Sequence, residues 1–336
     1  MQRCIIIGLG NRGLGWAHAA SMHRNVEAVA YVEPSEKSRE RAKECDWING
    51  DLFFDSFEDA TSAVQADMII DVTPPAIHHE VAAKAFAKGL HVLGEKPLSD
   101  DYETAVKVAK QSADSGLKHM VAQNYRFNAG SRKMKKLVDE KAIGDIGQLD
   151  VKFYKGWADL DGSHYVTQPY MLINDMMVHH FDLMRFLMGV DPVAVQAVTW
   201  NHPWGWHAGD AAHSIVFEFP NGLYATHVSV GCSVGNTQSD YFGEWRMDGS
   251  KGSLEWSDKR ITYAHMHRAE KKVREEIFTD PVPEQMDGIL TEFTAAIAED
   301  RQPECNPADN LYSVAMVFAA IKSAKEKRRV ELSELG

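Results

Sequence analysis

Cysteine, basic charge and long hydrophobic runs are all scarce in this sequence. Its four cysteines, Cys4, Cys45, Cys232 and Cys305, lie far apart and lack the spacing of metal ligands. They fit reduced thiols better than a disulfide framework, so we expect a cytoplasmic protein without a metal. No stretch reaches the length of a membrane-spanning helix, and the N-terminal apolar run is too short for a signal peptide.

The charge balance argues against two classes of partner. The net charge is -12 and the isoelectric point is about 5.7, without a basic run or an acidic tail. Because nucleic acids and anionic membranes are also negatively charged, such a protein is a poor binding partner for either. The 336 residues, of which 44% are hydrophobic and 25% charged, are typical of a globular protein and long enough for two domains.

Three glycines near the N-terminus carry the most information. The apolar run Ile5–Ile7 leads straight into Gly8-x-Gly10-x-x-Gly13. The run predicts a buried parallel strand. The glycines allow a tight turn, a close backbone approach to a pyrophosphate, and close packing of a helix on the strand. The N-terminus of that helix offers N–H groups to the phosphates. A chance glycine turn is the alternative.

An acidic residue follows at the distance that a dinucleotide site requires. The apolar stretch Val26–Val32 ends at Glu33, twenty residues beyond the last of these glycines. A carboxylate there accepts hydrogen bonds from the adenosine ribose and repels a 2′-phosphate. We therefore expect NAD as the cofactor. NADP is the alternative, because Lys37, Arg39 or Arg12 could reach the phosphate.

Strands and helices alternate over the first 120 residues, which predicts a parallel, doubly wound sheet. The expected strands are Cys4–Ile7, Ala28–Val32, Met68–Val72, His91–Leu93 and His119–Ala122. The expected helices include Ser35–Cys45, His78–Lys88 and Tyr102–Ser115. We assign residues 1–123 to a Rossmann domain that binds the dinucleotide.

After Arg126 the pattern changes to one dominated by strands. Helices are expected over Ser131–Lys141, Leu172–Met188, Glu284–Glu299 and Pro307–Lys325. Strands are expected over Leu149–Tyr154 and then repeatedly between Val193 and Phe278, with a hairpin turn at Pro220–Gly222. We therefore expect residues 124–336 to form an α+β domain on a mostly antiparallel sheet, giving an α/β protein overall.

Two loops follow central strands, at the edge where parallel sheets bind ligands. Thr73 and Pro74 begin the first loop, because prolines stop a central strand. Glu95-Lys96-Pro97 follows the strand His91–Leu93 directly. A lysine there can hydrogen-bond a substrate oxygen, and a surface loop lysine is the alternative. The proline can favour a cis peptide bond.

The expected helix Leu172–Met188 carries a second group of polar residues. Asp175, His179 and Asp182 are separated by four and three residues, which places them on one face of an α-helix. A carboxylate one turn from an imidazole can orient it and raise its basicity. Alternatively, Asp182 pairs with Arg185 in a structural ion pair. A metal site at Asp175 and His179 lacks a third ligand at a typical spacing.

Together these motifs resemble the Gfo/Idh/MocA family of nicotinamide-dependent oxidoreductases over nearly the whole chain. The matching elements are the glycine motif, Thr73-Pro74 with His78, Glu95-Lys96-Pro97, Arg126-Phe127, Gly144-Asp-Ile-Gly147 and the Asp175–His179–Asp182 helix. The family implies a Rossmann domain and a second domain whose open sheet commonly supports homo-oligomers, here a dimer or tetramer. It also implies a substrate between the domains, usually a sugar, polyol or related cyclic compound.

The resemblance implies roles for individual residues. It places catalysis on Lys96, Asp175 and His179. Cofactor contacts are expected from Gly8, Gly10, Asn11, Arg12, Gly13, Glu33, Thr73, Pro74, His78, Glu95 and Lys96. Substrate contacts are expected from Lys96, Asn124, Arg126, Trp157, Asp175 and His179. For Asn124 and Arg126, a structural role is the alternative.

Two departures from the family concern the pocket rather than the catalytic groups. Met177 stands where the family usually has glycine, and Met171–Asn174 replaces a glycine-rich entry. Two aromatic segments, Trp157–Tyr165 and Trp200–His207, are candidate substrate walls, with Asp159, Asp161 or His164 as hydroxyl ligands. Loop packing or an oligomer interface is the alternative for both segments.

The sequence thus predicts an NAD(P)-dependent dehydrogenase or reductase for a carbohydrate-like alcohol or ketone. The protein would supply orientation and proton transfer while the cofactor supplies the hydride chemistry. One alternative is an NAD-dependent glycosidase that oxidises a ring position transiently. The other is a nicotinamide-binding sensor without activity, against which the three retained polar residues argue.

Overall fold

The protein, described by a computed structural model, divides into two compact units. The structure describes residues 1–336 except 158–163, 236–237, 258–259, 268–269 and 278–281. Unit 1 comprises Met1–Phe127 and Pro283–Val314, and unit 2 comprises Asn128–Val282 and Ala315–Gly336. Both units are therefore discontinuous in sequence, whereas the boundary after residue 123 stays a prediction about two continuous domains.

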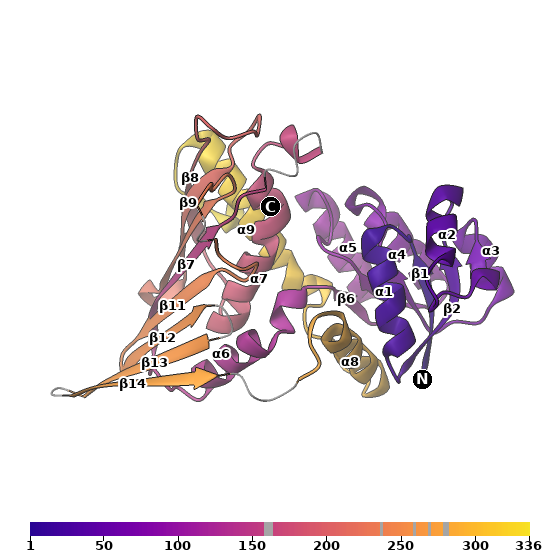
Figure 1. The fold of residues 1–336 in the computed structure, drawn as a ribbon, viewed down its shortest axis with the longest axis horizontal. Coiled ribbons are helices and arrows are strands. Elements are labelled where there is room, and N and C mark those ends of the chain that lie inside the picture. The colour runs from indigo at the N-terminus through magenta and orange to yellow at the C-terminus, as the bar shows by residue number, and fades with distance from the viewer. Residues whose placement is uncertain (158–163, 236–237, 258–259, 268–269, 278–281) are drawn as a thin grey trace. The chain divides into compact units, whose positions relative to one another are not determined.

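Unit 1 is built on a six-stranded sheet in the order β3-β2-β1-β4-β5-β6, with every neighbouring pair parallel (Figure 1). The strands are β1 (Gln2–Ile7), β2 (Val26–Val32), β3 (Phe53–Phe54), β4 (Met68–Asp71), β5 (His91–Gly94) and β6 (His119–Val121). The helices are α1 (Asn11–Met22), α2 (Glu36–Lys43), α3 (Phe57–Ala63), α4 (His78–Ala87), α5 (Tyr102–Ser115) and α8 (Gln285–Ala298).

The side chains of β1 point alternately into two hydrophobic cores of unit 1. Cys4 and Ile6 face a cluster that includes residues of α1 and α8, whereas Ile5 and Ile7 face residues of α3 and α4. Successive side chains of a strand point to opposite faces, so a run of apolar residues suits a sheet covered on both sides. This confirms the Rossmann-type layering that the sequence predicts.

Unit 2 is built on a nine-stranded sheet in the order β14-β13-β12-β11-β7-β10-β9-β8-β15 among the described residues. The strands are β7 (Ile146–Tyr154), β8 (Ala194–Trp200), β9 (Ala212–Glu218), β10 (Tyr224–Val230), β11 (Glu244–Gly249), β12 (Gly252–Ser257), β13 (Arg260–His267), β14 (Glu270–Ile277) and β15 (Val330–Glu331). Among the strands that the structure describes, only the pair β7 and β10 is parallel, so the sheet is mostly antiparallel as predicted.

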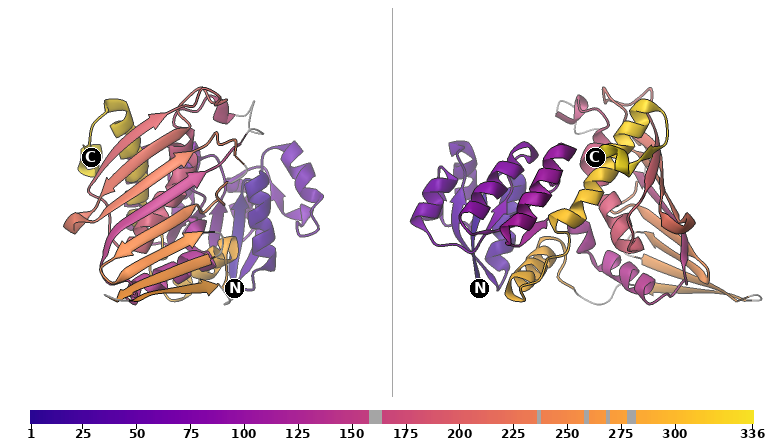
Figure 2. Two further views of the ribbon diagram at one scale, coloured as in Figure 1. Left: turned by 60° about the vertical axis from the view of Figure 1, so that its left-hand side comes forward. Right: turned by 180° about the vertical axis from the view of Figure 1, so that it is seen from behind.

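Helices cover one face of this sheet and leave the other open. They are α6 (Ala129–Asp139), α7 (Met177–Met188) and, from Ala315, the second half of α9 (Pro307–Glu326). Figure 2 shows the strands broadside with these helices behind them. The open face exposes Val198, Val216 and Tyr224. In the described part of the chain, no helix has the length and apolar character needed to cross a membrane.

Local sequence signals explain most element ends. Gly189 ends α7 with a left-handed φ of 68°, a conformation that glycine adopts at low cost. The Asn306 side chain accepts hydrogen bonds from the N–H groups of Ala308 and Asp309 at the start of α9. The predicted hairpin turn joins β9 to β10, with Asn221 and Gly222 at positive φ.

One predicted helix is only partly α-helical. The sequence predicts an α-helix over Leu172–Met188, but Leu172–Met176 form a π-helical turn and α7 begins at Met177. A π turn accommodates an extra residue and is frequent at functional sites. The prediction of one continuous α-helix was therefore wrong at its first turn, which contains Asp175.

Candidate active site

The glycine turn in unit 1 is shaped as a dinucleotide cradle. Gly8 has φ of 90°, and a side chain there would also meet the Val72 carbonyl oxygen at 2.8 Å. A Cβ on Gly13 would lie 2.0 Å from the Gly8 oxygen, so only glycine lets α1 approach the turn so closely. A Cβ on Gly10 would meet nothing within 4 Å. The backbone at Gly10 is therefore open to a ligand.

Glu33 is fixed against this turn. Its two carboxylate oxygens accept hydrogen bonds from the N–H groups of Leu9 (2.7 Å) and Ser35 (2.9 Å), and the residue is 8% exposed. Backbone donors on both sides hold the carboxylate at the end of β2, beside the glycine turn. This is the place at which a ribose hydroxyl would be recognised.

Glu95 connects the glycine turn to the loop that carries Lys96. One carboxylate oxygen accepts from Arg12 Nε at 2.5 Å and from Trp16 Nε1 at 2.7 Å, both on α1. The other oxygen accepts from the Lys96 backbone N–H at 3.2 Å. Arg12 and Glu95, both predicted to contact the cofactor, thus bind each other. Their direct contact with a cofactor stays a prediction.

His78 supports the two ligand-edge loops of unit 1. Its Nδ1 lies 3.0 Å from the Pro97 carbonyl oxygen, and its Nε2 lies 2.8 Å from that of Thr73. Carbonyl oxygens only accept, so each contact is a hydrogen bond when its own ring nitrogen carries the hydrogen. The Lys96–Pro97 peptide bond is cis, as proline allows. Buried His78 therefore holds the loops on either side of the predicted catalytic lysine.

Asp71 is buried near this histidine, and its burial changes its pKa. The pKa of Asp71 is raised by desolvation, and the nearby His78 opposes that shift. The Asp71 carboxylate accepts from the hydroxyl of Thr73 at 2.6 Å and from its N–H at 3.0 Å. Thr73, another predicted cofactor contact, is therefore oriented by the carboxylate at the end of β4.

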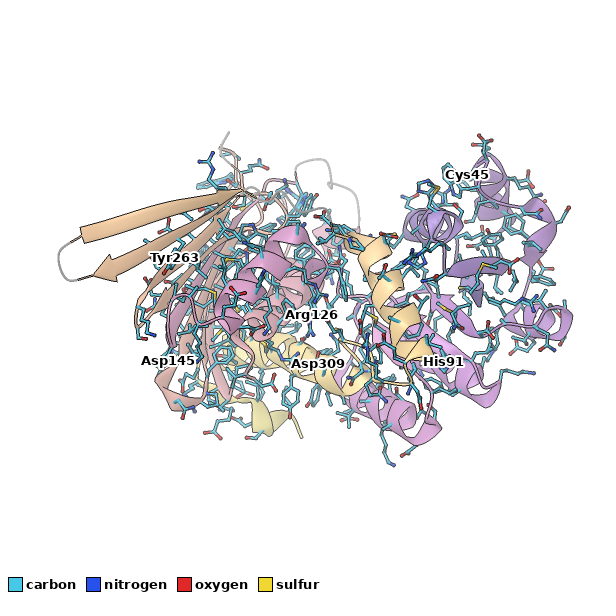
Figure 3. The ribbon with its side chains drawn as sticks, turned by 90° about the horizontal axis from the view of Figure 1, so that it is seen from below. Cys45, His91, Arg126, Asp145, Tyr263 and Asp309 are labelled. Atoms are coloured by element: carbon cyan, nitrogen blue, oxygen red, sulfur yellow. The ribbon has the colours of Figure 1, made fainter. Side chains whose placement is uncertain are left out.

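Asn124 and Arg126 have partners within unit 1. Asn124 Nδ2 donates to Gln285 Oε1 at 2.5 Å, and Arg126 Nη2 donates to Asp309 Oδ2 at 2.7 Å. Arg126 and Asp309 are both labelled in Figure 3. Arg126 is 5% exposed, so this ion pair gives the guanidinium the structural role that the sequence left open. Substrate binding by either residue stays a prediction.

Asp175 and His179 belong to unit 2. Asp175 lies in the π turn, and His179 lies in the first turn of α7, where it is 6% exposed. The Asp175 carboxylate accepts a hydrogen bond from the hydroxyl of Tyr165. Burial, and then this carboxylate, raise the pKa of Tyr165. Sequence reasoning missed Tyr165 as a partner of Asp175, although the residue ends a segment it had marked as a substrate wall.

His180, the neighbour of His179, has a different environment. Its Nε2 lies 3.0 Å from the carbonyl oxygen of Tyr241, and its Nδ1 lies 2.9 Å from His227 Nε2. His227 Nδ1 in turn lies 3.0 Å from His213 Nε2. Because a carbonyl only accepts, each Nε2 in this histidine chain (His180, His227 and His213) donates towards Tyr241. This histidine chain joins α7 to strands β9 and β10.

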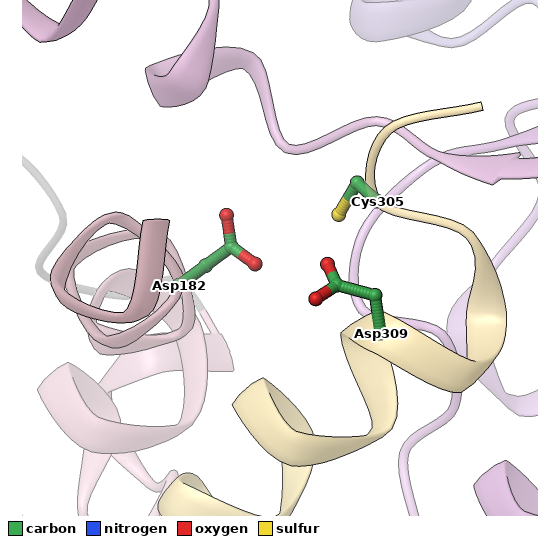
Figure 4. Close-up of side chains that lie close together, drawn as sticks. All are labelled: Asp182, Cys305 and Asp309. Atoms are coloured by element: carbon green, nitrogen blue, oxygen red, sulfur yellow. The ribbon is translucent and has the colours of Figure 1, made fainter. Parts of the chain in front are cut away.

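Asp182 has a structural partner. It is fully buried, and Arg185 Nη1 lies 3.9 Å from its carboxylate. Arg185 Nε also donates to Asp191 at 2.6 Å. These contacts match the ion-pair role that the sequence suggested as the alternative. Figure 4 shows Asp182 on α7, Asp309 in the first turn of α9 and Cys305 in the turn before α9.

The aromatic segments divide into described and undescribed parts. Trp157 is 9% exposed and its ring packs on Phe153 at a centroid distance of 5.9 Å, so core packing accounts for it. Its predicted substrate contact stays a prediction. Asp159, Asp161 and the side chain of His164 lie outside the described residues.

Two family models match this chain. One, described as an oxidoreductase family with an NAD-binding Rossmann fold, matches residues 2–123. The other, the GFO/IDH/MocA C-terminal domain, matches residues 131–255. The chain belongs to the Gfo/Idh/MocA family. It is therefore an oxidoreductase, and its cofactor is NAD.

Individual members of known function and solved structures are also similar to this Gfo/Idh/MocA protein. Inositol 2-dehydrogenase of Rhizobium meliloti is 25% identical over 81% of this chain and 82% of its own. An oxidoreductase from Agrobacterium radiobacter, solved with NAD+, L-tartaric acid and magnesium, has a TM-score of 0.89 at 18% identity, covering 100% and 99% of the two chains. A levoglucosan dehydrogenase has a TM-score of 0.83 at 20% identity, covering 98% and 99%.

The residues of unit 1 fit NAD. The glycine cradle leaves no room for a Cβ at Gly13, and Gly10 caps α1 without a side chain. The first N–H groups of α1 can therefore bind the pyrophosphate. Glu33 would bind the adenosine ribose. When bound, NAD supplies the hydride acceptor or donor of the reaction.

We expect this oxidoreductase to bind NAD about tenfold or more tightly than NADP, because the fixed Glu33 carboxylate repels a 2′-phosphate. Two cations that could compensate are already paired, Arg39 with Asp55 and Arg12 with Glu95. Calorimetric titration with both cofactors measures the preference.

A matched pair of variants assigns that preference to one residue. Glu33→Gln should reduce the preference, whereas Glu36→Gln, at an exposed acidic residue in the first turn of α2, should leave it unchanged. NADP binding as tightly as NAD in the wild type would contradict the assignment.

The histidine chain predicts a fall in stability on mild acidification. Burial lowers the pKa of His180 to about 4, of His213 to about 3 and of His227 well below its usual value. Their contribution is fully present above the unfolded pKa of about 6.5 and decreases as pH falls below it, because only the unfolded chain takes up protons.

Each of these histidines should then lower the free energy of unfolding by up to about 1.4 kcal/mol per pH unit between roughly pH 6 and 4. Urea unfolding at pH 7 and pH 5 measures this decrease. Equal free energies of unfolding at the two pH values would show that the three histidines of the histidine chain are not held neutral in the folded state.

Proposed function

We propose that this oxidoreductase transfers a hydride between NAD and a sugar, a polyol or a related cyclic alcohol or ketone. The observation that carries the proposal is the set of three polar residues placed on ordered elements beside the matched family motifs. Lys96 follows β5 in unit 1, whereas in unit 2 Asp175 lies in the π turn and His179 in the first turn of α7. Relatives named for inositol and levoglucosan support a polyhydroxylated substrate.

Each residue has a proposed chemical role. In the oxidation direction, His179 takes the proton of the reacting hydroxyl as general base. Asp175, itself bonded by the Tyr165 hydroxyl, orients His179. Lys96 hydrogen-bonds the reacting oxygen and stabilises negative charge that develops on it. In the reduction direction, the protonated His179 returns the proton to the same oxygen.

A substrate screen tests this function. The purified protein is incubated with NAD, or separately with NADP, and with a panel of sugars and cyclic and linear polyols. Reduced cofactor is followed by absorbance, and the keto forms are tested with NADH. We expect at least one polyhydroxylated compound to give sustained turnover. A complete panel without cofactor reduction or oxidation, for protein that binds NAD, would contradict the proposal.

We further propose that the protein forms a homo-oligomer, a dimer or tetramer, through the open face of the sheet in unit 2. The support is the row of exposed apolar side chains on adjacent strands, with Val198 59% and Tyr224 46% exposed. A second copy would cover them. Light scattering after size exclusion measures the mass. A monomer at micromolar concentration would refute this proposal.

A further inference from the structure

Among the described residues, five polar side-chain atoms of unit 2 are buried without a hydrogen-bond partner. One is Ser229 Oγ, and the other four lie on two short segments: Gln168 Oε1, Trp206 Nε1 and both ring nitrogens of His207. His207 is 5% exposed. Buried polar groups are normally paired, because leaving one unpaired costs free energy. Four such atoms on two short segments indicate that something outside the described chain provides their partners.

These two segments, residues 165–170 and residues 201–209, are packed directly on each other. The Ala208 N–H donates to the Val166 carbonyl oxygen at 2.8 Å, and a Cβ on Gly209 would lie 3.0 Å from the Cα of Pro169. Asn201 Nδ2 donates to the His207 carbonyl oxygen at 2.8 Å and closes the loop. These contacts involve backbone and a remote amide. They hold the segments in place and leave the four unpaired atoms for other partners.

The first of these segments is also bonded to the predicted catalytic helix. Tyr165 binds the Asp175 carboxylate, and Asn174 Nδ2 donates to the Pro169 carbonyl oxygen at 2.7 Å. The Asn174 N–H also donates to the Tyr170 carbonyl oxygen at 3.0 Å. A ligand group bound at the unpaired atoms would therefore belong to the same rigid part of unit 2 as Asp175.

The donor and acceptor pattern points to hydroxyl groups. The Trp206 indole only donates, Gln168 Oε1 only accepts, and a neutral His207 ring has one donor and one acceptor. A carboxylate or phosphate only accepts, and an ammonium only donates, so neither satisfies the whole set. Hydroxyls both donate and accept. The rings of Trp206 and His207 stack at 3.7 Å with 26° between their planes, and such a flat stack also suits the C–H face of a sugar.

We propose that Gln168, Trp206 and His207 form a subsite for hydroxyl groups of the substrate away from its reacting carbon. The proposal rests on the proposed function and names a determinant of its substrate specificity. The four atoms are out of reach of solvent, so binding selects an arrangement in which they are uncovered. Pairing them then contributes to affinity for the polyhydroxylated ligand, and a substrate lacking the hydroxyls loses that contribution.

Substitution of Trp206 tests the subsite in the active enzyme. Trp206→Phe keeps an aromatic ring and removes one donor. It should raise KM about tenfold and leave kcat within about twofold, since the subsite binds substrate without touching the reacting atoms. Trp47→Phe is the control, because Trp47 is a 41% exposed tryptophan of unit 1 and lies outside both candidate substrate walls. An unchanged KM in Trp206→Phe would overturn the proposal.

A binding measurement on the wild-type protein with NAD separates this inference from the proposed function. The indole N–H resonance of Trp206 is followed by NMR during titration with myo-inositol, D-glucose, D-glucitol or levoglucosan, with cyclohexanol as the control ligand. We expect at least one polyol, but not cyclohexanol, to shift it. No shift with any polyol would refute the subsite, even if NADH forms. A shift without turnover in the substrate screen would support the subsite and refute the dehydrogenase.

Discussion

Replacing Lys96 with methionine should lower turnover at least about a hundredfold while NAD binding stays within about twofold of the wild type. The reason is that Lys96 is proposed to act on the substrate oxygen. Methionine has similar length, cannot donate a hydrogen bond, and keeps the backbone N–H that binds Glu95. Steady-state kinetics on the best substrate and calorimetry with NAD measure the two quantities.

Lys88→Met is the matched control for this prediction. Lys88 is an exposed lysine at the C-terminal end of α4, in the same unit. Its replacement should change neither turnover nor NAD affinity. If Lys96→Met kept turnover near that of Lys88→Met, the catalytic assignment of the Glu95-Lys96-Pro97 loop would be wrong. If it lost NAD binding as well, Lys96 would act mainly on the cofactor.

The second large effect concerns His179 and His180, the two adjacent histidines of α7. His179→Ala should reduce turnover about a hundredfold to ten-thousandfold with the fold intact, because it removes the proposed general base. Activity of the wild type should decrease at low pH as His179 becomes protonated. That acid limb of the pH–rate profile should be missing from the residual activity of the variant.

His180→Ala should produce the opposite pattern. His180 is fully buried, and its removal leaves the Nε2–H of His227 without an acceptor. We expect a loss of about 2–4 kcal/mol in the free energy of unfolding, with the acid limb retained by the folded fraction. Urea unfolding and kinetics on both variants decide the matter. An essential His180 and a dispensable His179 would reverse the two assignments.

Features that depend on short stretches of sequence were predictable. The glycine turn, the acidic end of β2 and the alternating strands of unit 1 follow from local patterns, and the structure and family match confirm the fold. The glycine at the end of α7 and the asparagine that begins α9 are likewise local signals. These elements position Glu33 and Lys96 where the sequence places them.

Features that depend on packing between distant segments were not predictable. Helix α8 joins unit 1 because Ile289 and Phe293 complete a core formed by N-terminal residues. The histidine chain unites residues from α7, β9 and β10, and a single histidine in a strand pattern gives no sign of its partner. For the π turn at Leu172–Met176 we have no account from the sequence, since neither glycine nor proline lies in it.

The stoichiometry of cofactor reduction tests the central claim most directly. With the best substrate from the screen and excess NAD, the amounts of NADH formed and of substrate converted are measured in the same reaction. A dehydrogenase should form one NADH for each alcohol oxidised to a ketone. Release of an aglycone from a glycoside without net NADH would contradict this account and identify the chemistry as transient oxidation within a glycosidase cycle.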